Sequence, residues 1–334
     1  CALPISNDDI ATSIDIDGSG NCYVVGQTDD GTNEDAFIFK LNSTGTLAWS
    51  DSYDYDGQED GGILVSHVDA NTIEMMAITE DDGFVKELSK LVYNSTGTQQ
   101  SANRTSLGFD NAMLHDLQRQ SSGDYLACGW TPDATNGDKD IAIYKLSSTM
   151  TTTWSYTHDE NALDDWAASL SVDASGNVLA TGVVEIAAGD LNQVSIKLNS
   201  SGVLQWQENF EHLVHYNTRG IKGAVYDSDY YLSLGVKRED NGDIVNFFCM
   251  RAISDGELEW YWQDYEEGDV SPNFLAIGSS DEILFNALSN DGLTVSSSAY
   301  GLEIYKRNFN FTTETSTGAD YVDDQLIIKL VPNA

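Results

Sequence analysis

Basic residues are scarce in this sequence, and it has neither a long apolar run nor a helical apolar period. It holds 16 Lys and Arg against 54 Asp and Glu, which gives a formal net charge of −38 at pH 7. A surface this acidic repels nucleic acid and anionic membranes, so we expect neither as a partner. No stretch stays apolar for the roughly 18 residues that a membrane-spanning helix needs. No stretch keeps an apolar period of about 3.6 residues, so we expect almost no helix.

Catalytic signatures are missing as well. The sequence has no G-x-S-x-G, no H-E-x-x-H and no phosphate loop. His212 and His215 form an H-x-x-H with no third ligand nearby in the sequence, so a metal site is not favoured there. His67, His115 and His158 show neither nucleophile nor metal spacing. We therefore expect a protein that is not an enzyme.

What the sequence does have is a small residue that returns in steps of 51 to 53 residues, each time near the end of an apolar, β-rich run. A fixed period in this range is typical of a stacked or radial array of one unit. The six positions are Gly26, Ala77, Gly129, Gly182, Gly235 and Ala287.

Other residue classes keep step with the small residue. An acid precedes it by 17 to 19 residues, at Asp9, Asp60, Asp110, Asp165 and Asp269, with Thr218 in the fifth unit. A tryptophan follows at Trp49, Trp154, Trp206 and Trp260, with Ser101 at this place in the second unit. A base stands nine residues before each tryptophan, at Lys40, Lys145, Lys197 and Arg251, and Lys329 is a fifth copy.

Each unit reads as four short strands, near 11–17, 22–28, 35–41 and 46–52 in the first. The middle strands are apolar on both faces, which indicates a sheet covered on both sides. One such sheet cannot stand alone, and a radial arrangement of several buries both faces. We therefore predict a single all-β domain over 1–334, a β-propeller of four-stranded antiparallel blades. Six blades are favoured over seven, with repeats of about 8–58, 59–109, 110–163, 164–216, 217–268 and 269–334.

The last unit breaks the pattern. Its strands are expected near 274–279, 283–289 and 325–331, with no fourth strand and an insertion at 290–323. The insertion has room for an extra hairpin or for a degenerate seventh blade. Residues 1–7 have no partner, so we expect this N-terminal strand to supply the missing outer strand and close the ring. Pro4 is compatible with an edge strand only.

The segment from Asp9 to Trp49, with its Asp-Gly-Ser-Gly-Asn turn and its Lys40-Leu41-Asn42 run, resembles the SBBP-type β-propeller repeats of secreted and cell-surface proteins. The segment from Asp165 to Trp206 is nearly as close, and the second, fifth and sixth units are eroded. The resemblance implies an extracellular or cell-surface propeller and no particular chemistry, because one fold hosts many functions.

Cysteines and sequons bear on the compartment. A chain that starts at Cys1 suggests a processed form, with a lipid anchor or a bond to another chain as alternatives. Cys1 and Cys22 are the only pair that we expect to meet, and Cys128 and Cys249 are expected to be buried thiols. Five sequons are candidate glycosylation sites, at Asn42, Asn94, Asn103, Asn199 and Asn310.

The phased acids are the candidate metal site. If these acids lie together around one end of a central channel, their oxygens can bind a hard cation such as calcium. We expect no other cofactor. The preferred interpretation is structural: each acid accepts backbone N–H groups at a turn and holds neighbouring blades together. The phased bases are likewise interpreted as ion pairs or packed stems. The segment Asp15–Asn21 superficially resembles a calcium loop but lacks a closing Glu, so it is predicted to be a turn.

These observations favour a non-enzymatic extracellular structural or adhesive propeller. An exchanged N-terminal strand or a Cys1 disulfide would join copies into a filament or surface layer. Its partners are then other copies, surface proteins or glycans. A lectin-like propeller that binds glycans or cations is the alternative, and a polysaccharide lyase or hydrolase that uses carboxylates and His67 is the second alternative.

Overall fold

The computed structural model contains strands and turns and no helix among the residues that it describes, in agreement with the all-β prediction. It follows that no described helix offers the length and apolar character to cross a membrane. The described residues are 9–29, 31–83, 85–105, 114–210, 217–238, 244–263, 269–270, 275–277, 282–287, 289–290, 303–308 and 326–329.

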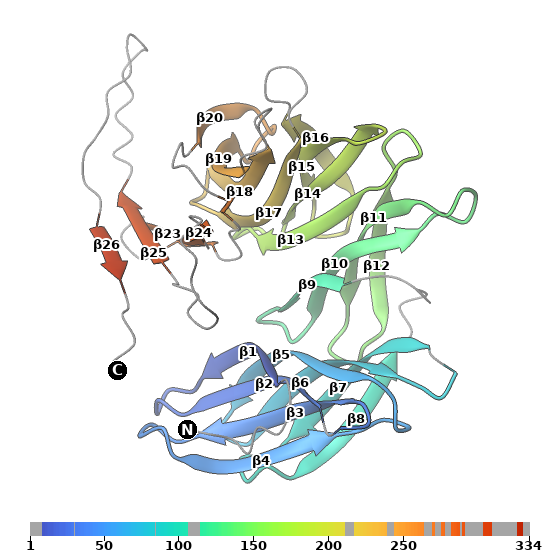
Figure 1. Cartoon of the computed structure of the whole chain (residues 1–334), viewed down its shortest axis with the longest axis vertical. Helices are drawn as coiled ribbons and strands as arrows, with labels where there is room; N and C mark the ends of the chain where they lie inside the picture. Colours follow the sequence, from blue (N-terminus) through green and yellow to red (C-terminus); the bar gives the residue numbers. More distant parts are fainter. Residues whose placement is uncertain are drawn as a thin grey trace. The chain divides into compact units, whose positions relative to one another are not determined.

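Twenty of the strands form five four-stranded antiparallel sheets, and in each sheet the four strands are consecutive in the chain (Figure 1). We call them the first to the fifth sheet. The first sheet has β1 (Ile10–Ile16), β2 (Cys22–Asp29), β3 (Glu34–Leu41) and β4 (Leu47–Tyr53). The second has β5 (Asp60–Asp69), β6 (Thr72–Glu80), β7 (Lys86–Tyr93) and β8 (Gln99–Thr105). The third has β9 (Leu114–Arg119), β10 (Tyr125–Pro132), β11 (Lys139–Leu146) and β12 (Thr152–His158). The fourth has β13 (Trp166–Val172), β14 (Val178–Ala187), β15 (Asp190–Leu198) and β16 (Leu204–Phe210). The fifth has β17 (Thr218–Val225), β18 (Tyr230–Arg238), β19 (Ile244–Ala252) and β20 (Leu258–Gln263).

The first sheet confirms the strand bounds expected from the sequence to within one residue. Its β1–β2 turn closes through the Asp17 carboxylate, which accepts the backbone N–H groups of Ser19 and Asn21 at 2.9 and 3.0 Å. Gly20 takes a φ of 78°, where a side chain would be strained. The segment Asp15–Asn21 therefore holds the end of β1 and a turn over Asp17–Asn21 that is stabilised by its own side chains, in agreement with the predicted turn.

The last unit differs from its prediction. A sixth sheet has the order β22 (Leu275–Ile277), β23 (Glu282–Ala287), β25 (Glu303–Asn308) and β26 (Leu326–Lys329). A short pair, β21 (Asp269–Val270) with β24 (Ser289–Asn290), precedes it. The sequence placed Lys329 on the third strand and left the fourth missing. In the structure β25, inside the expected insertion 290–323, is third and β26 is fourth. That prediction was wrong because the long β23–β25 connection hid a strand that was interpreted as part of an extra hairpin. Residues 1–7 lie outside the described residues.

The chain divides into two compact units, one of Cys1–Ala127 with Tyr144–Ser155 and one of Cys128–Ile143 with Tyr156–Ala334. The division passes through the third sheet. The single domain over 1–334 stays a prediction.

The recurring small residue lies on the second strand of its sheet and faces another small residue on the first strand. Four sheets show these pairs: Ala11 with Gly26, Gly62 with Ala77, Ala167 with Gly182, and Gly220 with Gly235. The next sheet touches the pair closely. A Cβ on Gly62 would lie 3.0 Å from the Gly26 backbone nitrogen, and one on Gly220 would lie 2.7 Å from the Gly182 carbonyl oxygen. The small residues thus mark where consecutive sheets approach backbone to backbone.

Candidate functional site: the joints between sheets

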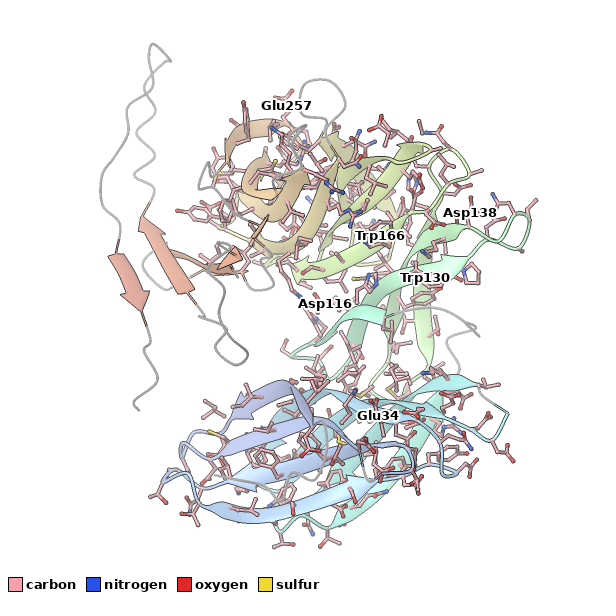
Figure 2. The ribbon with its side chains drawn as sticks, viewed as in Figure 1. Glu34, Asp116, Trp130, Asp138, Trp166 and Glu257 are labelled. Carbon is pink, nitrogen blue, oxygen red and sulfur yellow. The ribbon has the colours of Figure 1, made fainter. Side chains whose placement is uncertain are left out.

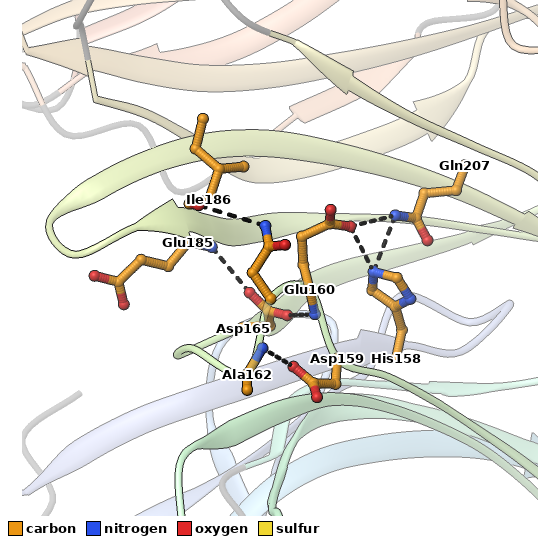
Figure 3. A network of polar contacts seen from close by, with 9 residues as sticks. His158, Asp159, Glu160, Ala162, Asp165, Glu185, Ile186 and Gln207 are labelled. Atoms are coloured by element: carbon orange, nitrogen blue, oxygen red, sulfur yellow. Dashed lines mark hydrogen bonds and ion pairs between the residues drawn. The ribbon is translucent and has the colours of Figure 1, made fainter.

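The polar residues that the sequence singled out gather where one sheet packs on the next. We call each such packed interface a joint. Asp60 and Asp165 are 2% and 0% exposed and occupy equivalent places in two joints. One Asp60 oxygen accepts the backbone N–H of Tyr55, in the loop from the preceding sheet, and the other accepts that of Glu80 at 3.1 Å. Asp165 does the same with Glu160 and with Glu185 at 2.9 Å (Figure 3). Each carboxylate therefore ties the incoming loop to the second strand of its own sheet.

The two loops that reach these acids have the same form. Asp54 accepts the backbone N–H of Gly57, and Asp159 accepts that of Ala162, each at 2.8 Å. Both loops turn through two consecutive residues of positive φ: Asp56 and Gly57, and Asn161 and Ala162. A seven-residue pattern, Asp-x-Asp/Asn-Gly/Ala-x-x-Asp, therefore carries each joint. Only the last aspartate of this pattern, Asp60 or Asp165, recurs with the period of the repeat in the sequence.

Burial controls the ionisation of both joint acids. It raises the pKa of Asp60 to about 6 and that of Asp165 to about 7, and the two backbone N–H bonds offset only part of this. Nearby acids add to the rise, Asp54 and Asp35 for the first and Asp159 and Glu160 for the second. Both joints therefore bind a proton more tightly in the folded chain than in the unfolded chain.

Stability should fall as the pH rises from 5 to 8. An acid whose folded pKa is raised contributes stability that is complete below its unfolded pKa and is lost as pH rises through the folded value, about 7 for Asp165. We expect Asp165→Asn to remove roughly 2 kcal/mol of this pH dependence. Urea midpoints at pH 5 and pH 8 measure it. The exposed Asp82→Asn variant is the charge control, and an equal flattening in that variant would contradict the assignment to Asp165.

The other phased acids differ in what surrounds them. Thr218 replaces the acid in the fifth sheet and keeps a linking role. Its hydroxyl donates to the Phe210 carbonyl at 3.0 Å and accepts the Gln193 backbone N–H at 2.9 Å, both in the fourth sheet. Asp9 accepts the Thr28 hydroxyl at 2.6 Å. Asp110 lies outside the described residues, and only the backbone of Asp269 is described.

The recurring tryptophan covers the last turn of the following sheet. The Trp49 indole N–H donates to the Ser95 carbonyl at 3.1 Å, and the Trp206 indole N–H donates to the Ile253 carbonyl at 2.9 Å. Both rings lie on a turn glycine. A Cβ on Gly97 would be 2.5 Å from the Trp49 ring, and one on Gly256 would be 2.8 Å from the Trp206 ring. The tryptophan and the glycine of the next sheet are thus a matched pair.

Between the second and third sheets both members of this tryptophan–glycine pair are replaced. Ser101 takes the place of the tryptophan, opposite Val92 as Trp49 is opposite Lys40. In the next turn Met150 takes the place of the glycine: its N–H donates to the Ser147 carbonyl, as that of Gly97 donates to Asn94. Met150 has a φ of 66° and is 3% exposed. A buried methionine and a serine therefore stand where the other sheets have a glycine and a tryptophan.

A double substitution tests this exchange. We expect Ser101→Trp alone to destabilise by about 1–3 kcal/mol, because the ring meets Met150. The pair Ser101→Trp with Met150→Gly should recover most of that loss, because it recreates the Trp49–Gly97 arrangement. Free energies of unfolding for both single variants and the double variant give the coupling. Strictly additive effects would contradict the exchange.

Two of the phased bases, Lys197 and Arg251, bind backbone carbonyls of a neighbouring sheet, and two others, Lys145 and Lys40, make contacts within their own sheet. The Lys197 ammonium donates to the Ile253 carbonyl at 2.8 Å, and the Arg251 guanidinium donates to the carbonyls of Gly256 and Asn209. Lys145 pairs with Asp124 at 3.6 Å, and the Lys40 ammonium lies 5.0 Å from the Tyr23 ring centre. Lys329 lies on β26, where only the backbone is described.

Sequence reasoning missed a buried ionic cluster around Glu74. The Glu74 carboxylate accepts from the Lys90 ammonium at 2.7 Å, from the Arg119 guanidinium at 2.6 Å and from the Tyr125 hydroxyl at 2.5 Å. Lys90 also donates to the Ser148 carbonyl of the third sheet at 3.0 Å. These residues do not recur at the period of the repeat. In the second unit Val92, and not Lys90, takes the position at which other units have the recurring base. Only three-dimensional proximity reveals the cluster.

Acids also gather beside the β10–β11 hairpin. Trp130 on β10 and Asp138 just before β11 flank the connecting loop (Figure 2). Burial and the charges of Asp159, Asp133 and Asp138 raise the pKa of Asp140 to about 6. Among the described residues no three His, Cys, Asp or Glu side chains meet in a way that would hold a metal ion. Calcium binding stays a prediction.

Cysteines and sequons fall at separate places. The Cys22 side chain is half-buried, and the Cys128 and Cys249 side chains are buried. Cys1 lies outside the described residues, so its pairing with Cys22 stays a prediction. Asn42, Asn94 and Asn199 each open a β-turn before the fourth strand, and each side-chain oxygen accepts two backbone N–H groups of that turn. Asn103 is exposed on β8, and Asn310 lies outside the described residues.

The histidines serve local contacts. The His67 ring stacks on Tyr23 with centres 5.5 Å apart. His158 lies 3.1 Å from a Glu160 oxygen and 3.0 Å from the Gln207 amide (Figure 3). Neither contact adds a nucleophile to the histidine.

Comparison with solved structures identifies the fold. The chain is similar to the β-propeller domain of the Trilobed protease from Pyrococcus furiosus, which is described as having an open velcro topology. That match has a TM-score of 0.53 and 8% identity and covers 90% of this chain and 81% of the other. Semaphorin 2a from Drosophila matches with a TM-score of 0.52 and 6% identity over 84% of this chain and 62% of the other. The sequence matches no protein-family model and no curated protein. The likeness shows a β-propeller repeat fold.

Proposed function

We propose that this propeller is a non-enzymatic structural or adhesive protein of the cell exterior that assembles with copies of itself. The supporting observation is that several residues that recur with the repeat make contacts between neighbouring sheets. Asp60, Asp165, Trp49, Trp206 and Lys197 each link one sheet or its loop to the next. The chemistry that the repeat conserves within the chain is thus devoted to holding sheets together.

We infer that six blades form a ring whose seam is the apolar face of β1. Ile14 and Ile16, which share one face of β1, are 62% and 59% exposed. Val65, at the register position of Ile14 in the second sheet, is 3% exposed and packs on Val25 and Ile38 of the first sheet. The same cover for β1 has to come from a last blade. Because β26 already fills the outer position of the sixth sheet, we expect such a ring to close without residues 1–7.

A ring that closes in this way leaves residues 1–7 available to a neighbouring copy. The segment Leu3-Pro4-Ile5 suits an edge position on another sheet. A head-to-tail contact of this kind does not close on itself and therefore extends into a filament or layer. The SBBP-like repeat supports an extracellular or cell-surface location, with Cys1 as the candidate site of a lipid anchor or an intermolecular disulfide and the turn asparagines as candidate glycan sites.

Electron microscopy of the native protein tests the assembly. We expect filaments or sheets, and we expect deletion of residues 1–7 to leave single particles with an unchanged circular dichroism spectrum. A non-reducing gel shows whether Cys1 contributes a covalent link. Monodisperse single rings of the full chain at high concentration and high salt, where the charge of −38 is screened, would contradict the proposal.

The glycan- or cation-binding alternative rests on the net charge and on the Asp138 and Asp140 side chains. Each has one oxygen with no hydrogen-bond partner among the described residues. Calorimetric titration with calcium and a glycan array test it. Binding that is lost in Asp138→Asn with Asp140→Asn would favour this function over assembly alone.

A further inference from the structure

The joint between the fourth and fifth sheets has a polar layer at a place where the first and fifth sheets carry apolar side chains. On the face that meets the next sheet, Val25 pairs with Ile38 in the first sheet and Leu234 pairs with Phe248 in the fifth. The fourth sheet has Thr181 opposite Ser195 at this place. Both hydroxyl-bearing residues are at most 1% exposed. Two hydroxyls thus replace the apolar pair of the repeat.

Gln193 belongs to the same layer. It is two residues from Ser195 on β15, so its side chain lies on the same face, and it is fully buried where the first sheet has Ala36. Its amide nitrogen donates to the Ser233 hydroxyl of the fifth sheet at 2.5 Å. A Cβ on Gly220 of the fifth sheet would lie 2.9 Å from the Thr181 methyl group, which places that sheet directly over the layer.

Three polar atoms of this layer have no hydrogen-bond partner among the described residues: the Thr181 hydroxyl, the Ser195 hydroxyl and the Gln193 amide oxygen. All three atoms are buried, and residues beside them on the same face, Leu179 next to Thr181 and Phe210 opposite Gln193, belong to apolar clusters. Leu179, Trp206, Tyr231 and Ile253 pack on one side, and Phe210, Phe247 and Cys249 pack on the other. An unsatisfied buried hydroxyl or amide costs about 1–3 kcal/mol, and three in one layer require an explanation.

We propose that Thr181, Gln193 and Ser195 bind one buried water molecule that completes the joint between the fourth and fifth sheets. A buried water typically makes about three hydrogen bonds. Here it donates to the Gln193 oxygen, and it exchanges one bond with each hydroxyl, which acts as donor or acceptor as needed. The ligand set has no carboxylate, so it suits a neutral molecule better than a divalent cation. This site is independent of the proposed assembly.

A crystal structure of the full chain is the direct test. We expect an ordered water peak about 2.7–3.2 Å from all three atoms. Crystals grown with rubidium chloride distinguish water from a monovalent ion, because rubidium scatters anomalously. An anomalous peak in the layer, or no peak between the three atoms, would overturn the proposal.

Variants provide a second test in solution. Thr181→Val keeps the shape and removes one water ligand, so we expect its thermal midpoint to fall by about 1–3 °C. Val25→Thr is the matched reference, because it places a hydroxyl at the same register position in the joint between the first and second sheets, opposite the apolar Ile38. A midpoint that rises in Thr181→Val would show that the hydroxyl is simply unsatisfied and would overturn the water site.

Discussion

Replacing Gly182 by valine should destabilise the chain by at least about 3 kcal/mol and leave little folded protein at 37 °C. A Cβ at this position would lie 2.2 Å from the Trp166 carbonyl oxygen and 2.8 Å from the Ala167 Cα. Both are backbone atoms of β13, so no side chain can swing away to make room. Gly182 has no positive φ, and the expected loss is therefore steric. Urea unfolding followed by tryptophan fluorescence measures it.

Two further variants isolate the cause. Gly18→Ala is the matched control, because a Cβ there meets no atom within 4 Å, and we expect a change below about 0.5 kcal/mol. In the second sheet Ala77 faces Gly62, whereas in the fourth Gly182 faces Ala167. The exchange Ala167→Gly with Gly182→Ala recreates the arrangement of Gly62 and Ala77, and we expect it to be tolerated better than Gly182→Ala alone because a glycine at position 167 lets the β13 backbone shift away from the added Cβ. If the single and the double variant lose equal stability, the small pair is not the unit that the joint requires.

The sequence predicted the sheets well because their determinants are local. The alternation in β1, the glycine turn at Gly20 and the spacing of small residues lie within one unit, and the structure confirms the strands that they predicted. The recurrence of Gly26 and Gly182 predicted a repeated unit, but not the small partner on the first strand, because that pairing depends on register. The strand at Glu303–Asn308 was missed because a long connection separates it from β23.

The joints were harder to predict because their partners come from different units. Trp49 recurs visibly, whereas its glycine partner Gly97 lies 48 residues later and looks like an ordinary turn residue. Glu74, Lys90 and Arg119 follow no common phase, and neither do the hydroxyls of the fourth sheet. The residues that recur with the repeat indicate the contacts that the joints share. The residues that differ between joints become apparent only in the structure.

These differences give each joint its own chemistry. The first and second sheets meet through Val25, Ile38 and Val65, and the second and third meet through the Glu74 cluster. The fourth and fifth meet through hydroxyls and an amide. Sheets built from one repeat resemble one another, so wrong pairings compete during folding. A polar or ionic layer rejects an apolar neighbour, because its groups would be left unpaired. The eroded positions of the repeat thus help to select the order of the sheets.

We expect the removal of the Glu74 carboxylate to be the second substitution with a large effect on the free energy of unfolding. Glu74→Ala leaves the Lys90 ammonium and the Arg119 guanidinium without their shared partner, and Lys90 is only 7% exposed. We expect a loss of about 3–5 kcal/mol in the free energy of unfolding, since breaking a buried ion pair strands a charge. The exposed pair Lys139–Asp164 is the control, and Asp164→Ala should cost below about 1 kcal/mol.

The pH dependence of the Glu74 cluster separates charge from packing. Burial alone would raise the pKa of Glu74, but the bonds from Lys90, Tyr125 and Arg119 outweigh it and hold the pKa below its ordinary value. Its stability contribution is therefore complete above the unfolded pKa and is lost as pH falls through the folded value, opposite in sign to that of Asp165. In Glu74→Ala the loss should shrink below pH 4, where the unfolded wild-type carboxyl is already protonated. The triple variant Glu74→Met, Lys90→Met and Arg119→Met should recover much of the stability at neutral pH, because it strands no charge. A triple variant as unstable as Glu74→Ala would show that the cluster acts through packing instead.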